Sequence, residues 1–118
     1  MALPIVPLTT AKVSWVDPTL GTDNQPLSGG DAITGVLVGL RSLTATGSVA
    51  GTYPFTAQVA ANVTTEAVAA VLGANMKADS YAAAVQVLSS NGPAAWSAEF
   101  SFQGALPVPL AATGVSVA

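Results

Sequence analysis

The 118-residue chain contains no cysteine and no histidine. It can therefore form no disulfide bond and no thiolate or imidazole metal site. The same two absences remove the Cys–His and Ser–His pairs that activate a catalytic nucleophile. The sequence predicts a protein that is not an enzyme and that uses no cofactor and no metal.

Charged residues are also scarce, at 8% of the chain against roughly 25% in an average soluble domain. The formal net charge is −3, and Lys12, Arg41 and Lys77 are the only cations. Nucleic-acid binding needs clustered cations that neutralise phosphates, so we expect no nucleic-acid partner. We expect each cation to be isolated and solvated, although in so uncharged a chain each could instead form an ion pair with a partner.

Long hydrophobic runs are missing as well, because Gly, Thr, Ser and Pro interrupt every apolar stretch. No stretch reaches the 18 or so residues of a membrane-spanning helix, so we expect no membrane partner. The first residues lack the basic and apolar regions of a signal peptide, which predicts synthesis in a cytoplasm. With 51% hydrophobic residues, the chain predicts one folded domain whose weakly charged surface is covered by partner proteins. The alternative is an Ala-rich domain with an ordinary Thr, Ser and Gly surface.

The acidic residues offer little chemistry. Asp17, Asp23 and Asp31 lie in one stretch rich in turn-forming residues, but the spacing of a calcium loop is absent. Because Asp side chains commonly hydrogen-bond their own backbone in turns, we expect turn and capping roles there. Glu66 and Asp79 could pair as acid and base, but we expect them at opposite ends of one connection, as solvated carboxylates.

Short β-branched runs between turn signals predict an all-β protein. We expect strands over residues 11–16, 32–41, 53–60, 80–88 and 96–102. Residues 64–76 are ambiguous, because their apolar residues recur at helical spacing; we favour a strand that ends near Leu72. The core expected from the apolar faces comprises Val13, Trp15, Val36, Val38, Leu72, Tyr81, Val85, Val87 and Phe100.

Two apolar, Pro-containing segments flank the central domain of residues 11–104. Residues 2–8 and 105–110 echo one another, and paired prolines favour extended backbone. We therefore expect an N-terminal arm over residues 1–10 and a C-terminal arm over residues 105–118. The arms could lie on the domain's own edges or dock on neighbouring subunits. The candidate partner contacts are Leu3, Pro4, Ile5, Val6, Pro7, Leu8, Leu106, Pro107, Val108, Pro109, Leu110, Val115 and Val117.

The ordered set of segments over about residues 11–102 resembles a fibronectin type III domain. Residues 13–15 resemble the B strand with its core tryptophan, and residues 17–27 resemble the B–C loop of bacterial and phage members. Residues 33–38, 81–87 and 91–97 resemble the C strand, the F strand and the F–G turn with the start of G. The resemblance implies a seven-stranded antiparallel β-sandwich with extended arms.

Within that resemblance, Tyr81 takes the tyrosine-corner role and Leu72 that of the E-strand leucine. The distance between these two residues is longer than is usual in the family, which implies a longer or partly helical E–F connection. Val36 stands where the family usually has a tyrosine.

Stand-alone domains of this family with extended arms are similar to proteins of tailed-phage virions, which decorate or cement capsids or form parts of tails. The resemblance implies a non-enzymatic virion protein, most simply a capsid decoration protein made in the host cytoplasm. Its partners would be capsid or tail subunits, with self-association as a further option. The alternative is a module that binds glycans or a host receptor through loops 21–31 and 44–51, which an exposed Tyr53 or Trp96 would support.

Overall fold

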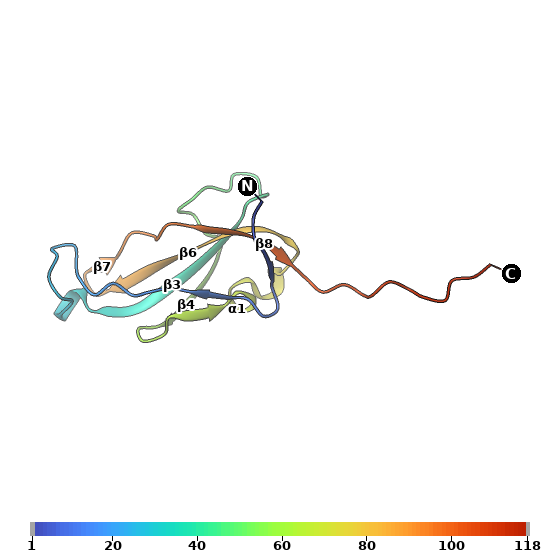
Figure 1. Cartoon of the computed structure of the whole chain (residues 1–118). Coiled ribbons are helices and arrows are strands. Elements are labelled where there is room, and N and C mark those ends of the chain that lie inside the picture. The colour runs from blue at the N-terminus through green and yellow to red at the C-terminus, as the bar shows by residue number, and fades with distance from the viewer. Residues whose placement is uncertain (1, 118) are drawn as a thin grey trace.

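The structure is a computed structural model that describes residues 2–117. Within them the chain forms eight strands and one α-helix (Figure 1). This confirms the all-β prediction at the level of fold class. The strands are β1 (Ile5–Pro7), β2 (Lys12–Ser14), β3 (Ile33–Ser42), β4 (Phe55–Ala60), β5 (Thr65–Ala67), β6 (Asp79–Ser89), β7 (Gly92–Pro93) and β8 (Phe100–Ala105). The helix is α1 (Val68–Leu72), and 3-10 turns cover Gly29–Asp31 and Gly73–Asn75.

The strands divide unequally between two sheets. The larger sheet has the order β1-β8-β6-β3-β4, with β7 paired to β6. Its centre is the long antiparallel pair β3 and β6, in which Val38 lies opposite Val85 and Leu40 opposite Ala83. The smaller sheet contains only β2 and β5, which are antiparallel.

This architecture differs from the expected seven antiparallel strands, because the N-terminal segment joins the larger sheet. Strand β1 pairs with β8 in parallel, and Ile5 lies opposite Gln103. The turn after β1 then places Leu8 over Gly104, where a Cβ atom would come within 2.5 Å of the Leu8 side chain. Leu8 is fully buried. The prediction that Leu8 contacts a partner is therefore wrong, because this residue belongs to the core.

The core lies between the larger sheet and a layer formed by β2, β5 and α1. Of the residues expected there, Val36, Val38, Leu72 and Tyr81 are buried. Val13, Trp15 and Val85 pack against the core while partly exposed, and Val87 is half-buried. The core also contains residues that the expected set omitted: Leu8, Leu40, Val68, Val71, Ala83 and Phe102.

Phe100 is the exception among the expected core residues, since it is 60% exposed. In the sheet it lies opposite Ala83, which lies opposite Leu40. Side chains at paired positions share a face, so Phe100 is on the face that bears the core. Alternation along the strand predicted this face correctly, but no layer covers it at this point. Phe100 therefore lies at the edge of the core rather than within it.

Residues 64–76 contain a short strand followed by a helix, so the prediction of a strand ending near Leu72 is wrong. Only Thr65–Ala67 is extended. The helix buries Val68, Val71 and Leu72, which fall on one face at helical spacing. Gly73, with a φ of 54°, ends this helix. Leu72 thus reaches the core from a helix.

The last strand begins at Phe100, so the prediction of a strand from Trp96 is wrong for its first part. Ahead of it, the indole of Trp96 packs with the ring of Tyr53 over Gly39 on β3. Because Gly39 has no side chain, both rings can approach the backbone there. Trp96 therefore covers the outer face of the larger sheet, opposite the core.

After β8 the chain leaves the domain as an extended segment (Figure 1). Leu106 still packs against the core. Residues 107–117 are all exposed, and we call them the tail. The tail makes the molecule 77 Å long, although its other two dimensions are 29 and 26 Å.

Candidate functional site

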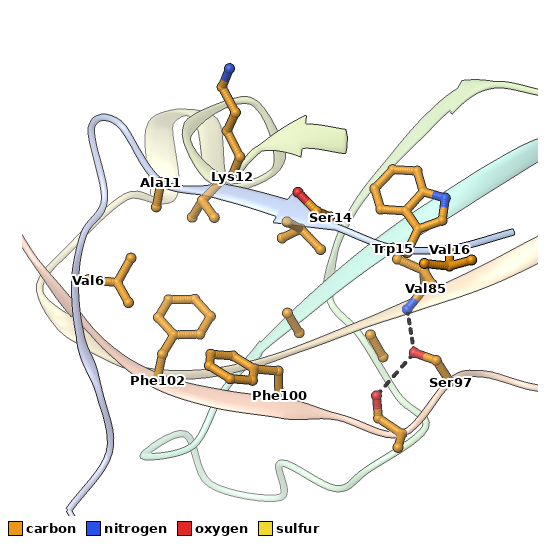
Figure 2. A pocket seen from close by; sticks show the side chains of 15 residues that line it. Val6, Ala11, Lys12, Ser14, Trp15, Val16, Val85, Ser97, Phe100 and Phe102 are labelled. Atoms are coloured by element: carbon orange, nitrogen blue, oxygen red, sulfur yellow. Dashed lines mark hydrogen bonds between the residues drawn. The ribbon is translucent and has the colours of Figure 1, made fainter. Parts of the chain in front are cut away.

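An apolar groove lies between β2 and the larger sheet, along the side where β8 begins (Figure 2). Its volume is about 480 Å³. Val13 and Trp15 line it from the β2 side, and Val85, Phe100 and Phe102 line it from the larger sheet. The groove is therefore a gap between the two layers of the domain.

The groove leaves large apolar side chains open to solvent. Phe100 is 60% exposed and Val16 is 95% exposed, and both line the groove. Lys12 is its one charged lining residue, and the ammonium group points away from the phenyl rings (Figure 2). Ser14 and Ser97 are polar but neutral. The lining is therefore largely apolar, which is the kind of surface that an apolar partner would cover.

Unpaired strand edges border the groove. Strand β2 pairs only with β5 among the strands of residues 2–117. The bonds from Trp15 N–H to the Thr64 carbonyl and from Val68 N–H to the Ala11 carbonyl lie on that side. Backbone groups alternate between the two edges of a strand, so those of Lys12 and Ser14 face the groove edge. That edge can accept a further strand.

The exposed tail carries the second concentration of apolar surface. Its exposed fractions are 80% for Val108, 96% for Leu110, 85% for Val115 and 96% for Val117. Pro107 and Pro109 restrict the backbone at its start to extended conformations. The C-terminal residues predicted to contact a partner are therefore accessible, apart from Leu106, which is partly buried against the core.

The N-terminal candidates are distributed differently from the C-terminal ones. Pro4, Ile5 and Pro7 are exposed, with Ile5 at 71%. Val6 packs against the core and points into the groove (Figure 2). Leu3 is half-buried. The N-terminal segment therefore lies along the domain's own sheet edge, which was one of the two alternatives for the arms.

No family model, curated protein or solved structure matches this chain.

A polar cluster on the outer face of the larger sheet pairs Arg41 with Glu99. The Arg41 Nε atom lies 2.7 Å from Glu99 Oε2, and Nη2 lies 2.8 Å from Oε1. Arg41 is therefore not the isolated cation that the sequence suggested. Its hydrogen bonds hold the pKa of the Glu99 carboxyl below the ordinary value, although burial opposes this effect. Burial and the hydrogen bond from its hydroxyl to Glu99 raise the pKa of Tyr53.

Asp79 is an internal hydrogen-bond acceptor rather than the solvated carboxylate expected. Its side chain is 6% exposed. The hydroxyls of Ser42 and Thr44 donate to it at 2.6 and 2.7 Å, and Ser80 N–H donates at 2.8 Å. Burial acts to raise the pKa of the Asp79 carboxyl, but these hydrogen bonds outweigh it and lower the pKa. The hydrogen bond from Ser42 to Asp79 thus connects the end of β3 to the start of β6.

Asp23 and Asp31 act within their own turns, as expected from the sequence, whereas Asp17 accepts a hydrogen bond from the Trp15 indole N–H at 3.0 Å. Asp23 accepts a hydrogen bond from Gln25 N–H at 3.0 Å, and Asp31 accepts one from Ser28 N–H at 2.6 Å. Across residues 2–117, no three acidic, His or Cys side chains cluster in a way that could hold a metal ion. In the same residues, no helix has the length and apolar character needed to cross a membrane.

Proposed function

We propose that this protein is a non-enzymatic structural subunit that binds other protein subunits through its apolar tail. The observation that carries this proposal is the exposure of Val108, Leu110, Val115 and Val117, all at least 80% accessible. Burying a valine or leucine side chain contributes about 1.5–3 kcal/mol. Binding of a partner surface that buries these side chains would therefore be favourable.

At the level of fold, we propose a fibronectin type III-like β-sandwich. Strands β2 and β5 would correspond to B and E, and β3, β6 and β8 to C, F and G. Support comes from Tyr81, whose buried ring sends its hydroxyl to the Lys77 carbonyl at 2.8 Å. This is the hydrogen bond that a tyrosine corner makes to backbone a few residues upstream.

By that resemblance we propose a place in a tailed-phage virion, as a capsid decoration or cement protein made in the host cytoplasm. The partners would be capsid or tail subunits. The low content of charged residues suits a surface that is permanently covered by other subunits. Glycan or receptor binding is less well supported, because Tyr53 and Trp96 pack on each other at 4.5 Å and on Gly39.

Co-sedimentation with companion proteins tests the proposed function. The tagged full chain would be produced in cells that also make the other structural proteins of its source. We expect the full chain in the high-mass fraction and a chain lacking residues 107–118 in the low-mass fraction. An Ile5→Asp variant, changed at a site on β1 that is 71% exposed, serves as the control and should sediment like the wild type. Low-mass sedimentation of the full chain, or no effect of the deletion, would refute the proposal.

A further inference from the structure

The groove lies beside β2, where the smaller sheet has no further strand. Two strands form the smaller sheet, whereas five strands lie side by side along the larger one. The smaller layer is therefore too narrow to cover the core face at Phe100. A strand placed beside β2, at the usual spacing of about 4.8 Å, would lie over the groove. It would pair with the open edge of β2 and cover Phe100 and Val16.

The tail has the apolar, uncharged side chains that a strand in this groove would need. Residues 104–118 contain no charged side chain, which matches the largely apolar groove. Within residues 113–117, Val115 and Val117 alternate with Ser116, so an extended conformation directs both valines to one face and the serine to the other. Gly114 has a φ of 70° in the free tail, so this glycine would change conformation when the segment extends, as glycine readily does. Five extended residues then span roughly 16 Å, about the length of the β2 segment from Lys12 to Val16. The tail can thus supply both apolar side chains and backbone partners.

The tail of the same molecule is poorly placed to fill its own groove. It leaves the domain after β8 and runs away from it, through Pro107 and Pro109 (Figure 1). Strand β1 already covers the nearest part of β8, from Gln103 to Ala105. A return path would have to reverse direction and cross β1. A second molecule meets neither obstacle.

We propose that residues 113–117 of one copy bind in the groove of a second copy, as an added strand that runs parallel to β2 and brings Val117 beside Val16. This inference rests on the proposed function, because it names the partner of the tail. Each copy presents one tail and one groove, so the contact is head-to-tail and repeats from copy to copy. It closes into a ring or continues as a filament, according to the rotation between neighbours.

Disulfide trapping tests this contact, since the chain has no cysteine of its own. Full-length Val16→Cys chains would be mixed with full-length Val117→Cys chains under mild oxidation. We expect a mixed disulfide dimer at least severalfold more abundant than in a matched mixture of Val16→Cys with Val108→Cys. A chain carrying both Val16→Cys and Val117→Cys should give a ladder of linked species. A monomer with an internal disulfide, or equal yields in the two mixtures, would overturn the inference.

Solution mass provides the second measurement. Light scattering of the full chain over a hundredfold concentration range should show a mass that rises with concentration. Val117→Asp in the tail and Val16→Asp at the groove should each keep the chain monomeric, because each places a charge in the contact. Val108→Asp, which is outside residues 113–117, should associate like the wild type. Circular dichroism checks that every variant is folded, since all three sites are at least 80% exposed.

These results separate the inference from the proposed function. If the purified chain stays monomeric and forms no trapped dimer, while deletion of the tail still prevents co-sedimentation with companion proteins, the tail binds another protein. The inference is then wrong and the proposed function stands. If deletion of the tail also leaves co-sedimentation unchanged, both are wrong.

Discussion

At the scale of single residues, several polar side chains of this protein form hydrogen bonds that connect different strands and loops of the domain. Tyr81 ties β6 to the Lys77 carbonyl, and Arg41 ties β3 to Glu99. Asp79 accepts hydrogen bonds from the hydroxyls of Ser42 and Thr44 and from the backbone N–H of Ser80. A hydrogen bond to a charged group contributes more than a neutral one, so these few contacts matter in a chain with so few charges.

Asp79 gives a prediction about pH. Its folded-state pKa lies below the ordinary value of about 3.9. Its stabilising contribution is therefore complete above about pH 4 and is lost as the pH falls through the folded-state pKa. Asp79→Asn should lower the free energy of unfolding at pH 7 by about 1–3 kcal/mol, because the Ser42 and Thr44 hydroxyls lose a charged acceptor. The difference from the wild type should narrow below pH 4, as measured by urea unfolding from pH 7 to pH 2.

Asp23→Asn is the matched control for this pH series. It removes the same charge from an exposed loop position. Its stability should stay within about 0.5 kcal/mol of the wild type at pH 7. If Asp79→Asn and Asp23→Asn behaved alike across the whole range, the hydrogen bonds to Asp79 would contribute nothing to stability.

At the scale of elements, short segments take their conformation from what they pack against. Helix α1 has five residues, too few for a stable isolated helix. It persists because Val68, Val71 and Leu72 are buried against the larger sheet. Strand β1 has three residues, and its position beside β8 is reinforced by the burial of Leu8 immediately after it.

The contact between Leu8 and Gly104 gives a prediction about this element. Leu8→Ala should destabilise the domain by about 2–5 kcal/mol, through lost burial and the cavity left behind. Gly104→Ala should cost about 1–3 kcal/mol, because its methyl group would overlap the Leu8 side chain. The double variant should lose less than the sum of the two, since each change relieves the other. Denaturant unfolding of the four proteins measures this coupling.

Ile5→Ala is the control, because it shortens a side chain on the same strand, β1, at a position outside the core. The Ile5 side chain is 71% exposed, so this change should cost less than about 1 kcal/mol. Additive losses at Leu8 and Gly104 would show that the two residues do not share one packing site.

At the scale of the whole molecule, the domain and the tail are separable. Residues 107–117 are exposed throughout, so removing them takes no side chain out of the core. A chain lacking residues 107–118 should keep the unfolding free energy of the full chain within about 0.5 kcal/mol at low protein concentration. Small-angle X-ray scattering should show a shorter maximum dimension than that of the full chain. A clear loss of stability would mean that the tail docks on its own domain.

The sequence by itself determined the fold class, the positions of the long strands and the absence of Cys- or His-based chemistry. Alternating apolar residues predicted β3, β4 and β6, because period-two patterning is a local property of a half-buried strand. The same alternation put Phe100 on the core face. The apolar C-terminal segment of residues 105–118 predicted Val115 and Val117 as candidate partner contacts, and both side chains are exposed.

Only the tertiary structure decided which segments meet. Arg41 and Glu99 are 58 positions apart, and no local pattern links them. Leu8 entered the core because of long-range packing, which no local pattern predicts. Helical spacing within residues 64–76 already indicated α1, but a helix of five residues is stable only because it is buried against the larger sheet. The groove has the same origin: β1 joined β8 and left the open edge of β2 without a neighbour. Sequence periodicity specifies which face of a strand is apolar, but the number of strands that cover that face depends on pairing between distant segments.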